Sequence, residues 1–76
     1  MVVDVVDIAK TVGLVLGRAN VKPSDRLCED LGAESADMLN IVVTMEEKFK
    51  IQIDEADVPS IRTVSDLHEV VRRMTA

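Results

Sequence analysis

Apolar residues recur at three- and four-residue intervals in three stretches of this chain, which is the repeat of helices with one buried face. In the first stretch the repeat continues as far as Leu16, and Gly17 is a suitable terminator. The apolar positions of this stretch are Val2, Val5, Val6, Ala9, Val12 and Leu16. Because valine slightly disfavours helix, a strand from Val2 to Val6 is the alternative. The repeat extends well beyond Val6 and therefore favours a helix.

The second stretch, from about Ser35 to Lys50, predicts the best-defined helix of the chain. Asp37 lies in its first turn and Lys48 in its last turn, where the helix dipole favours each charge. The predicted buried face consists of Met38, Val42, Met45 and Phe49, with Leu39 at its margin.

Two further helical segments are predicted in the last third of the chain. A short turn of helix from Asp54 to Val58 has Asp54 as its cap, and Pro59 discourages its continuation. Thr63 and Asp66 have the spacing of a capping box, with Asp in place of the usual Glu or Gln, and they start the last helix. The apolar face of that helix carries Val64, Leu67, Val70, Val71 and Met74.

The segment from Arg18 to Glu34 has no helical repeat and predicts a long loop between the first two helices. Its turn-forming residues are Pro23, Ser24, Asp25 and Gly32. The apolar residues expected to fold it onto the core are Val21, Leu27 and Leu31. Loops of this length usually serve a function. The elements together predict an all-α fold in one domain, residues 1–76: a small antiparallel four-helix bundle of three longer helices and one short helix, with a long first loop.

Charge and composition narrow the classes of partner. The chain has 76 residues, one aromatic side chain and a formal net charge of -5, so its core is expected to be aliphatic and its surface acidic. An acidic surface repels phosphate backbones and anionic lipids, which argues against nucleic-acid and membrane partners and suits basic proteins. Neither a signal-peptide pattern nor an apolar stretch of the ~20 residues that span a membrane occurs. A reducing cytoplasm is the expected location.

Few residues of this chain suit chemistry of their own. Cys28 is the single cysteine, so an internal disulfide is excluded, and we interpret it as a small buried hydrophobe rather than a reactive thiol. The acidic residues Asp54, Glu55 and Asp57 lack the spacing of a calcium-binding loop, and no metal site is expected.

Ser35 stands out because it follows a glycine-containing loop at the start of the predicted second helix. A catalytic serine needs a base, and the single histidine, His68, lies in the last helix, where we interpret it as a solvated surface residue. An enzyme is therefore not expected. The free N–H groups at a helix N-terminus favour an attached phosphate or phosphodiester, which makes Ser35 a candidate modification site. The alternative is that Ser35 or Glu34 simply caps the helix.

The segment from Leu27 to Asp37, which reads LCEDLGAESAD, resembles the modification site of acyl carrier proteins, usually E-D-L-G-x-D-S-L-D. The similarity continues through residues 45–49, 53–55 and 61–64 in order and spacing. The resemblance implies a bundle that carries 4'-phosphopantetheine on Ser35, attached from coenzyme A by a phosphopantetheinyl transferase. Acyl groups would be carried as thioesters on the arm's thiol and presented to fatty-acid or polyketide-type enzymes.

The resemblance also implies where cargo and partners contact the chain. In bacterial fatty-acid members the acyl chain lies between the helices, and the corresponding lining here is Val42, Met45, Ile53, Ile61 and Leu67. Acyl-transferring and chain-elongating enzymes with basic docking patches would contact the second helix of a monomeric carrier. The implied partner surface consists of Glu34, Ala36, Asp37, Asn40, Ile41, Val43 and Glu47.

The chain departs from the family pattern at three positions. Glu34 replaces the usual Asp, Ala36 replaces a leucine that offers partners an apolar contact, and Asn40 stands where an acidic residue is common. Our hypothesis is a carrier for a specialised pathway. A peptidyl, aryl or D-alanyl carrier is an alternative, although such sites more often read G-G-x-S or G-x-D-S. A structural interaction module whose Ser35 is never modified is the third possible function.

Overall fold

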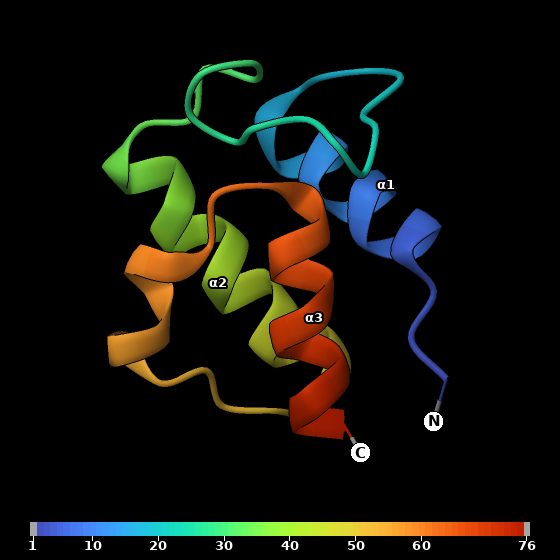
Figure 1. Cartoon of the computed structure of the whole chain (residues 1–76), viewed down its shortest axis with the longest axis vertical. Helices are drawn as coiled ribbons and strands as arrows, with labels where there is room; N and C mark the ends of the chain where they lie inside the picture. Colours follow the sequence, from blue (N-terminus) through green and yellow to red (C-terminus); the bar gives the residue numbers. More distant parts are fainter. Residues whose placement is uncertain (1, 76) are drawn as a thin grey trace.

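The computed structural model of this chain describes residues 2–75 and contains three α-helices and one 3-10 helix (Figure 1). The elements in chain order are α1 (Val5–Leu16), α2 (Ser35–Phe49), η1 (Glu55–Ser60) and α3 (Val64–Thr75). Within residues 2–75 there is no strand, and the only extended pairing is an isolated bridge between Arg26 and Thr63. The predicted all-α class, with three longer helices and one short helix, is confirmed.

Helix α1 begins at Val5, three residues after Val2, which is the first apolar position of the predicted repeat. The Asp4 carboxylate accepts a hydrogen bond of 2.9 Å from the Val6 N–H, so Asp4 is the N-cap and Val2 precedes the helix. Aspartate is among the best N-cap residues because its side chain satisfies an otherwise unpaired N–H, and this effect outweighs the apolar repeat. The alternative of a strand at this end is wrong. Gly17 ends the helix in the left-handed conformation, at φ +66°, as predicted.

The predicted cap of the last helix is confirmed in detail. The Asp66 N–H donates to Thr63 Oγ1 at 3.0 Å, and the Thr63 N–H donates to the Asp66 carboxylate at 3.1 Å. The preceding short helix differs from the prediction, because η1 extends through Pro59 to Ser60. The fixed φ of proline suits a 3-10 helix as well as an α-helix, and the missing N–H removes a single hydrogen bond.

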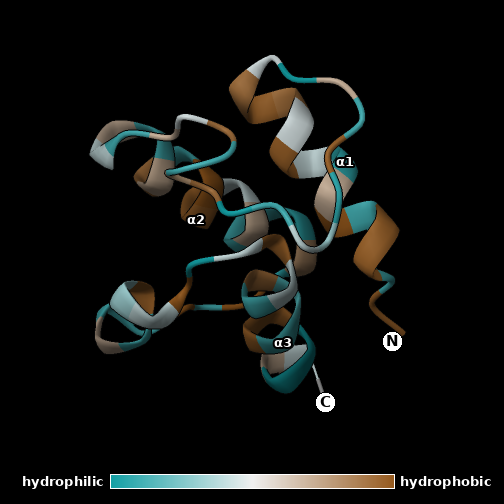
Figure 2. Ribbon diagram, turned by 45° about the horizontal axis from the view of Figure 1, so that its top comes forward, coloured by the Kyte–Doolittle hydropathy of each residue, from teal (hydrophilic) through white to brown (hydrophobic). Residues whose placement is uncertain are grey.

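The core is aliphatic and is built from all three α-helices and the long loop. The largest fully buried side chains are Ile8, Leu27, Ile41, Met45, Leu67, Val12, Val64 and Val71. Figure 2 shows apolar and polar positions alternating along α3, which is the pattern of a helix with one buried face. His68 lies on this helix half-buried, with Nε2 2.8 Å from the Val3 carbonyl oxygen. The interpretation of His68 as a solvated residue is therefore wrong, because it holds the segment before α1 against α3.

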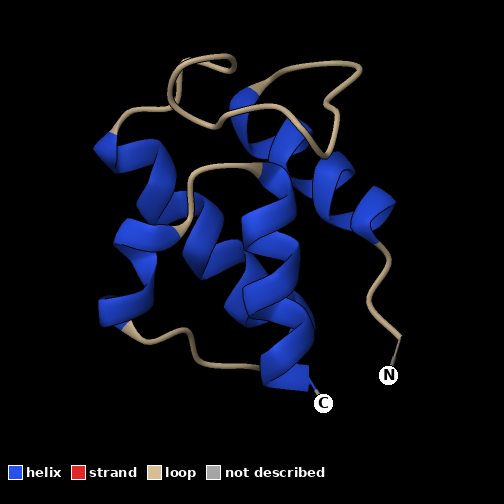
Figure 3. Cartoon of the chain, viewed as in Figure 1, coloured by secondary structure: helices blue, strands red, loops and turns tan. Residues whose placement is uncertain are grey.

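The loop between α1 and α2 is pinned to the segment that leads into α3 (Figure 3). Leu27 is fully buried, and its N–H donates to the Arg62 carbonyl at 2.8 Å. The Val64 N–H in turn donates to the Asp25 carbonyl at 3.1 Å. As predicted, Val21 and Leu31 also pack against the core, although both stay partly exposed. These contacts hold the loop that leads to Ser35 against the start of α3.

Candidate functional site

Ser35 is the first residue of α2 and its side chain is exposed. The N-cap position belongs to Glu34, whose backbone is extended and whose N–H donates to the Asp37 carboxylate at 2.9 Å. Within residues 2–75 the Ser35 hydroxyl makes no hydrogen bond. Ser35 is therefore not the cap, and the structure leaves its oxygen free.

The turn before Ser35 depends on a small buried residue and a glycine. Gly32 adopts φ +71°, a left-handed conformation that costs glycine little, and its N–H donates to the Cys28 carbonyl at 3.1 Å. Ala33 is buried, and its N–H donates to the Leu27 carbonyl at 2.9 Å. The chain thus returns to the core one residue before Glu34, which fixes the direction in which Ser35 faces.

Cys28, the residue after Leu27, was predicted to be buried, and the structure corrects this prediction. Cys28 is exposed rather than buried, because Leu27 takes the core position and the chain turns Cys28 outward. Arg26 stabilises the same turn: its guanidinium contacts Asp30 at 3.1 and 3.2 Å and Glu29 at 3.1 Å. Hydrogen bonds from the Arg26 side chain and backbone lower the pKa of Asp30. These exposed pairs order the loop more than they stabilise the fold.

A groove of about 820 Å³ begins at Ser35 and runs between the loop, α2, η1 and the start of α3. Its apolar side is formed by Met38, Leu39, Val58, Pro59 and Ile61. Its polar edge is formed by Arg26, Cys28, Glu29, Arg62, Thr63 and Asp66. A flexible group attached to the Ser35 oxygen would find apolar surface within its first few bonds.

Of the five residues predicted to line the acyl chain, one borders this groove and four lie in the core. Ile61 borders it, whereas Met45 and Leu67 are fully buried and Val42 and Ile53 are at most 8% exposed. None of the four core residues lines the groove. Ile61 is itself only 5% exposed, so it contacts both the groove and the core.

The predicted partner surface contains one error. Ile41 is fully buried, because it follows Met38 by three residues and precedes Met45 by four and so shares their core-facing side. The predicted residues with exposed side chains are Glu34, Ala36, Asn40, Val43 and Glu47. Asp37 is half-buried, with its carboxylate bonded to the Glu34 N–H.

Leu39 belongs to the exposed side of α2, although the sequence placed it at the margin of the buried face. Its side chain is 65% exposed, and Val43, four residues later, is 48% exposed. Leu39 also follows Ser35 by four residues, and this spacing is the signal that could have identified it. The two exposed apolar residues therefore continue the Ser35 side of the helix.

Asp66, at the edge of the groove, gives a testable pH dependence. Its carboxylate accepts hydrogen bonds of 3.1 Å from the N–H groups of Thr63 and Arg62, and these bonds lower its pKa below the ordinary 3.8. A lowered pKa means that the ionised form favours the folded state. The stabilisation is present above the pKa of the unfolded chain and is lost as pH falls through the pKa of the folded chain.

We expect Asp66→Asn to lower the free energy of unfolding by about 1 kcal/mol near pH 7 and by much less at about pH 3. Urea unfolding followed by circular dichroism at both pH values measures the difference. The control is Glu55→Gln, an exposed carboxylate that accepts no hydrogen bond within residues 2–75 and should leave the value near pH 7 unchanged. A deficit of equal size at both pH values would contradict the capping role of the charge.

Among residues 2–75, no cluster of three or more His, Cys, Asp or Glu side chains is arranged to hold a metal ion. None of the helices in this part of the chain combines the length and apolar character needed to cross a membrane.

Comparison with known proteins decides the family. A family model described as the phosphopantetheine attachment site matches residues 6–71. An acyl carrier protein of Syntrophobacter fumaroxidans is 35% identical over 77 aligned positions, which cover 100% of this chain and 93% of that protein. The chain belongs to the acyl carrier protein family. The resemblance found in the sequence is thereby confirmed.

Other relatives align over shorter stretches. An acyl carrier protein of Helicobacter hepaticus is 45% identical over 47 residues, which is 62% of each chain. One of Chlamydia muridarum is 40% identical over 53 residues, 70% of this chain and 69% of the relative. The crystal structure of an acyl carrier protein from Thermotoga maritima superposes with a TM-score of 0.77 at 24% identity, covering 92% of this chain and 84% of that one. This last likeness supports the fold alone.

The prosthetic group of this family is a covalently attached 4'-phosphopantetheine, as the sequence led us to expect. The chemistry at Ser35 fits such a group. Its hydroxyl is exposed and without a hydrogen-bond partner in residues 2–75, it lies at a helix N-terminus, and a partly apolar groove starts beside it.

Proposed function

We propose that this chain carries acyl groups as thioesters on 4'-phosphopantetheine attached to the Ser35 oxygen. The observation that supports this site best is the free, exposed hydroxyl of Ser35 at the first position of α2. The N–H groups of Ser35 and Ala36 have no acceptor within residues 2–75, so they are available to a phosphodiester at this position.

The chain acts as a substrate of enzymes rather than as a catalyst. Neither a histidine nor a carboxylate is hydrogen-bonded to the Ser35 hydroxyl in the described residues, so the base that takes its proton must come from the transferase. The transferase forms the bond between the Ser35 oxygen and phosphorus and releases the nucleotide part of coenzyme A. The attached arm supplies a terminal thiol for the thioester, and its tether keeps the cargo at a high local concentration near a docked enzyme.

The groove beside Ser35 is the surface that would receive the arm. Met38, Val58 and Pro59 offer it apolar contact, and Ile61 connects this groove to the core. The interior lining by Val42, Met45, Ile53, Ile61 and Leu67 is part of the same proposal. An acyl chain would enter past Ile61 and displace packing between the helices.

The attachment is tested by incubating the chain with coenzyme A and a broad-specificity phosphopantetheinyl transferase. Intact-mass measurement should show one phosphopantetheine-sized increment, and fragment mapping should place it on the peptide that contains Ser35. The absence of an increment would instead support an unmodified structural module. An increment on another residue would contradict the site.

The exposed side of α2 supports a specialised pathway. Its exposed positions after Ser35 are Ala36, Leu39, Asn40, Val43, Glu47 and Lys48, of which only Glu47 is acidic. Basic docking patches of general fatty-acid enzymes would be steered weakly by a single exposed acidic residue. We propose that the partners, besides the transferase, are dedicated acyl-transferring and chain-elongating enzymes acting on a monomeric, cytoplasmic carrier.

We expect Ala36→Leu to strengthen docking to a housekeeping fatty-acid enzyme about ten-fold, since burial of the larger side chain contributes at most about 2 kcal/mol. Ala36 is exposed, so the change should not disturb the fold. Affinity is measured by calorimetry with the holo chain. Ala56→Leu, at an exposed alanine of η1 that does not line the groove beside Ser35, is the matched control and should change nothing. Wild-type affinity and turnover equal to those of a housekeeping carrier would contradict the specialised pathway.

A further inference from the structure

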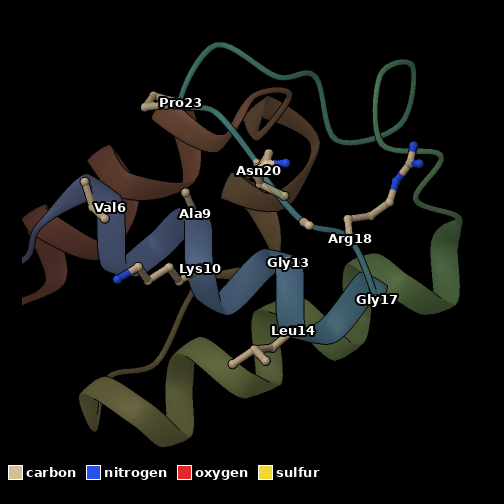
Figure 4. A pocket seen from close by; sticks show the side chains of 11 residues that line it. Val6, Ala9, Lys10, Gly13, Leu14, Gly17, Arg18, Asn20 and Pro23 are labelled. Atoms are coloured by element: carbon tan, nitrogen blue, oxygen red, sulfur yellow. The ribbon is translucent and has the colours of Figure 1, made fainter.

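A second groove, of about 770 Å³, lies between the outer face of α1 and the first part of the long loop (Figure 4). Val6, Lys10 and Leu14 line it at four-residue spacing along one side of α1. Val6 is 50% exposed and Leu14 is 84% exposed, so neither of these apolar side chains is covered by the rest of the chain. None of the residues lining this groove also lines the groove beside Ser35.

The base of this groove is held in place by close backbone packing. A Cβ at Gly13 would lie 2.6 Å from the Arg18 carbonyl oxygen, and the Arg18 N–H donates to the Gly13 carbonyl at 2.9 Å. Gly13 and Ala9 are buried and small, so the loop packs closely against this part of α1. The opposite side is the loop through Asn20 and Pro23 (Figure 4). The groove therefore exists before any partner binds.

The charge of this groove is opposite to that of the whole chain. Its only charged lining residues are Lys10 and Arg18, in a protein with a net charge of -5. Neither forms an ion pair within residues 2–75. The Arg18 guanidinium donates to the backbone carbonyl of Asp30 at 3.0 Å and points away from α1, so Lys10 is the charge that lies beside Val6 and Leu14 (Figure 4). An apolar surface with unpaired positive charge is complementary to apolar groups flanking a carboxylate.

A second copy of this chain fits the groove poorly. If two α1 helices packed antiparallel so that Val6 met Leu14, Lys10 would face Lys10 of the other copy. Parallel packing in register places the same two lysines together. Two chains of charge -5 also repel each other at long range.

We infer that this groove is a docking site for an amphipathic helix of a partner protein, in which an acidic residue lies between two apolar residues at four-residue spacing. The apolar residues pack against Val6 and Leu14, and the carboxylate faces Lys10, which lies between those two residues along α1. Because the two grooves share no lining residue, a partner can hold the carrier here while Ser35 remains accessible. This surface goes beyond the proposed function and does not depend on modification of Ser35.

The test uses two helical peptides on the 76-residue chain, one with Leu-x-x-x-Glu-x-x-x-Leu and one with Lys in place of the Glu. We expect the Glu peptide to shift the amide NMR signals of α1 and of residues 18–23 and to bind about five-fold tighter than the Lys peptide. Lys10→Glu should reverse this order. Leu14→Ser should weaken both peptides about ten-fold, whereas Met74→Ser, at an exposed apolar residue of α3, should not.

Three results would overturn the inference. One is equal binding of both peptides to the wild-type chain. Another is a set of shifts centred on α2 instead of α1. The third is a dimer in sedimentation whose formation is abolished by Leu14→Ser, because the occupant would then be a second copy. Ser35→Ala should bind the Glu peptide as the wild type does, so failure of the attachment proposal and failure of this docking site are distinguishable.

Discussion

A Ser35→Ala variant is expected to fold like the wild-type chain and to gain no mass when incubated with coenzyme A and a phosphopantetheinyl transferase. The Ser35 hydroxyl is exposed and has no hydrogen-bond partner in residues 2–75, so its removal breaks no contact of the fold. Alanine is a strong helix former at the start of α2. The free energy of unfolding should therefore change by no more than about 0.5 kcal/mol. Loading, by contrast, is lost completely, because the attacking oxygen is gone.

The matched control for this variant is Ser24→Ala. Ser24 is another exposed serine, it lies in the long loop, and its side chain makes no hydrogen bond within residues 2–75. Ser24→Ala should accept the full mass increment. Circular dichroism of both variants separates a lost attachment site from a lost fold. An increment that persists in Ser35→Ala would contradict the proposed site directly.

The largest expected effect on stability is that of Leu67→Ala. Leu67 is fully buried on α3, and truncating a buried leucine costs about 2–5 kcal/mol because a cavity remains. Small domains have only about 5–15 kcal/mol in total, so the variant should be largely destabilised and close to unfolding. Urea unfolding measures the difference. Met74→Ala, on the same helix but 41% exposed, is the control and should lose less than about 1 kcal/mol.

The same variant tests whether cargo enters the core. If an acyl chain lies among Val42, Met45 and Leu67, it fills part of the cavity left by Leu67→Ala. Loading with a medium-length acyl group should then stabilise the variant more than it stabilises the wild-type chain. An equal effect of acylation on both would contradict the interior lining and favour cargo held outside the core, in the groove beside Ser35.

Local signals in the sequence were sufficient for the helices and for the family. The box of Thr63 and Asp66 was readable because both partners lie within one turn of helix. Gly17 was also readable from local sequence. It ends α1 in the left-handed conformation, which glycine adopts at little cost because it has no side chain. The segment around Ser35 is contiguous, and the model match over residues 6–71 confirmed the family that it suggested.

Local sequence signals could not predict which individual apolar residues are buried. Ile41 and Leu39 are both apolar and only two positions apart on α2, yet Ile41 is fully buried and Leu39 is 65% exposed. A repeat of 3.6 residues predicts that a buried side exists, but its edges depend on where neighbouring elements pack. Cys28 was misplaced for the same reason, since the position of Leu27 in the core decides which way the next side chain turns.

The sequence by itself therefore determined which segments form helices and that Ser35 starts one of them. Its patterns also predicted no catalytic base for this serine. Only the tertiary structure decided that the Ser35 oxygen is left free beside a groove, since this depends on Leu27 fixing the loop against Arg62 and on Glu34 taking the cap. Helical periodicity is a property of neighbouring residues, whereas exposure and grooves arise from contacts between segments distant in the chain.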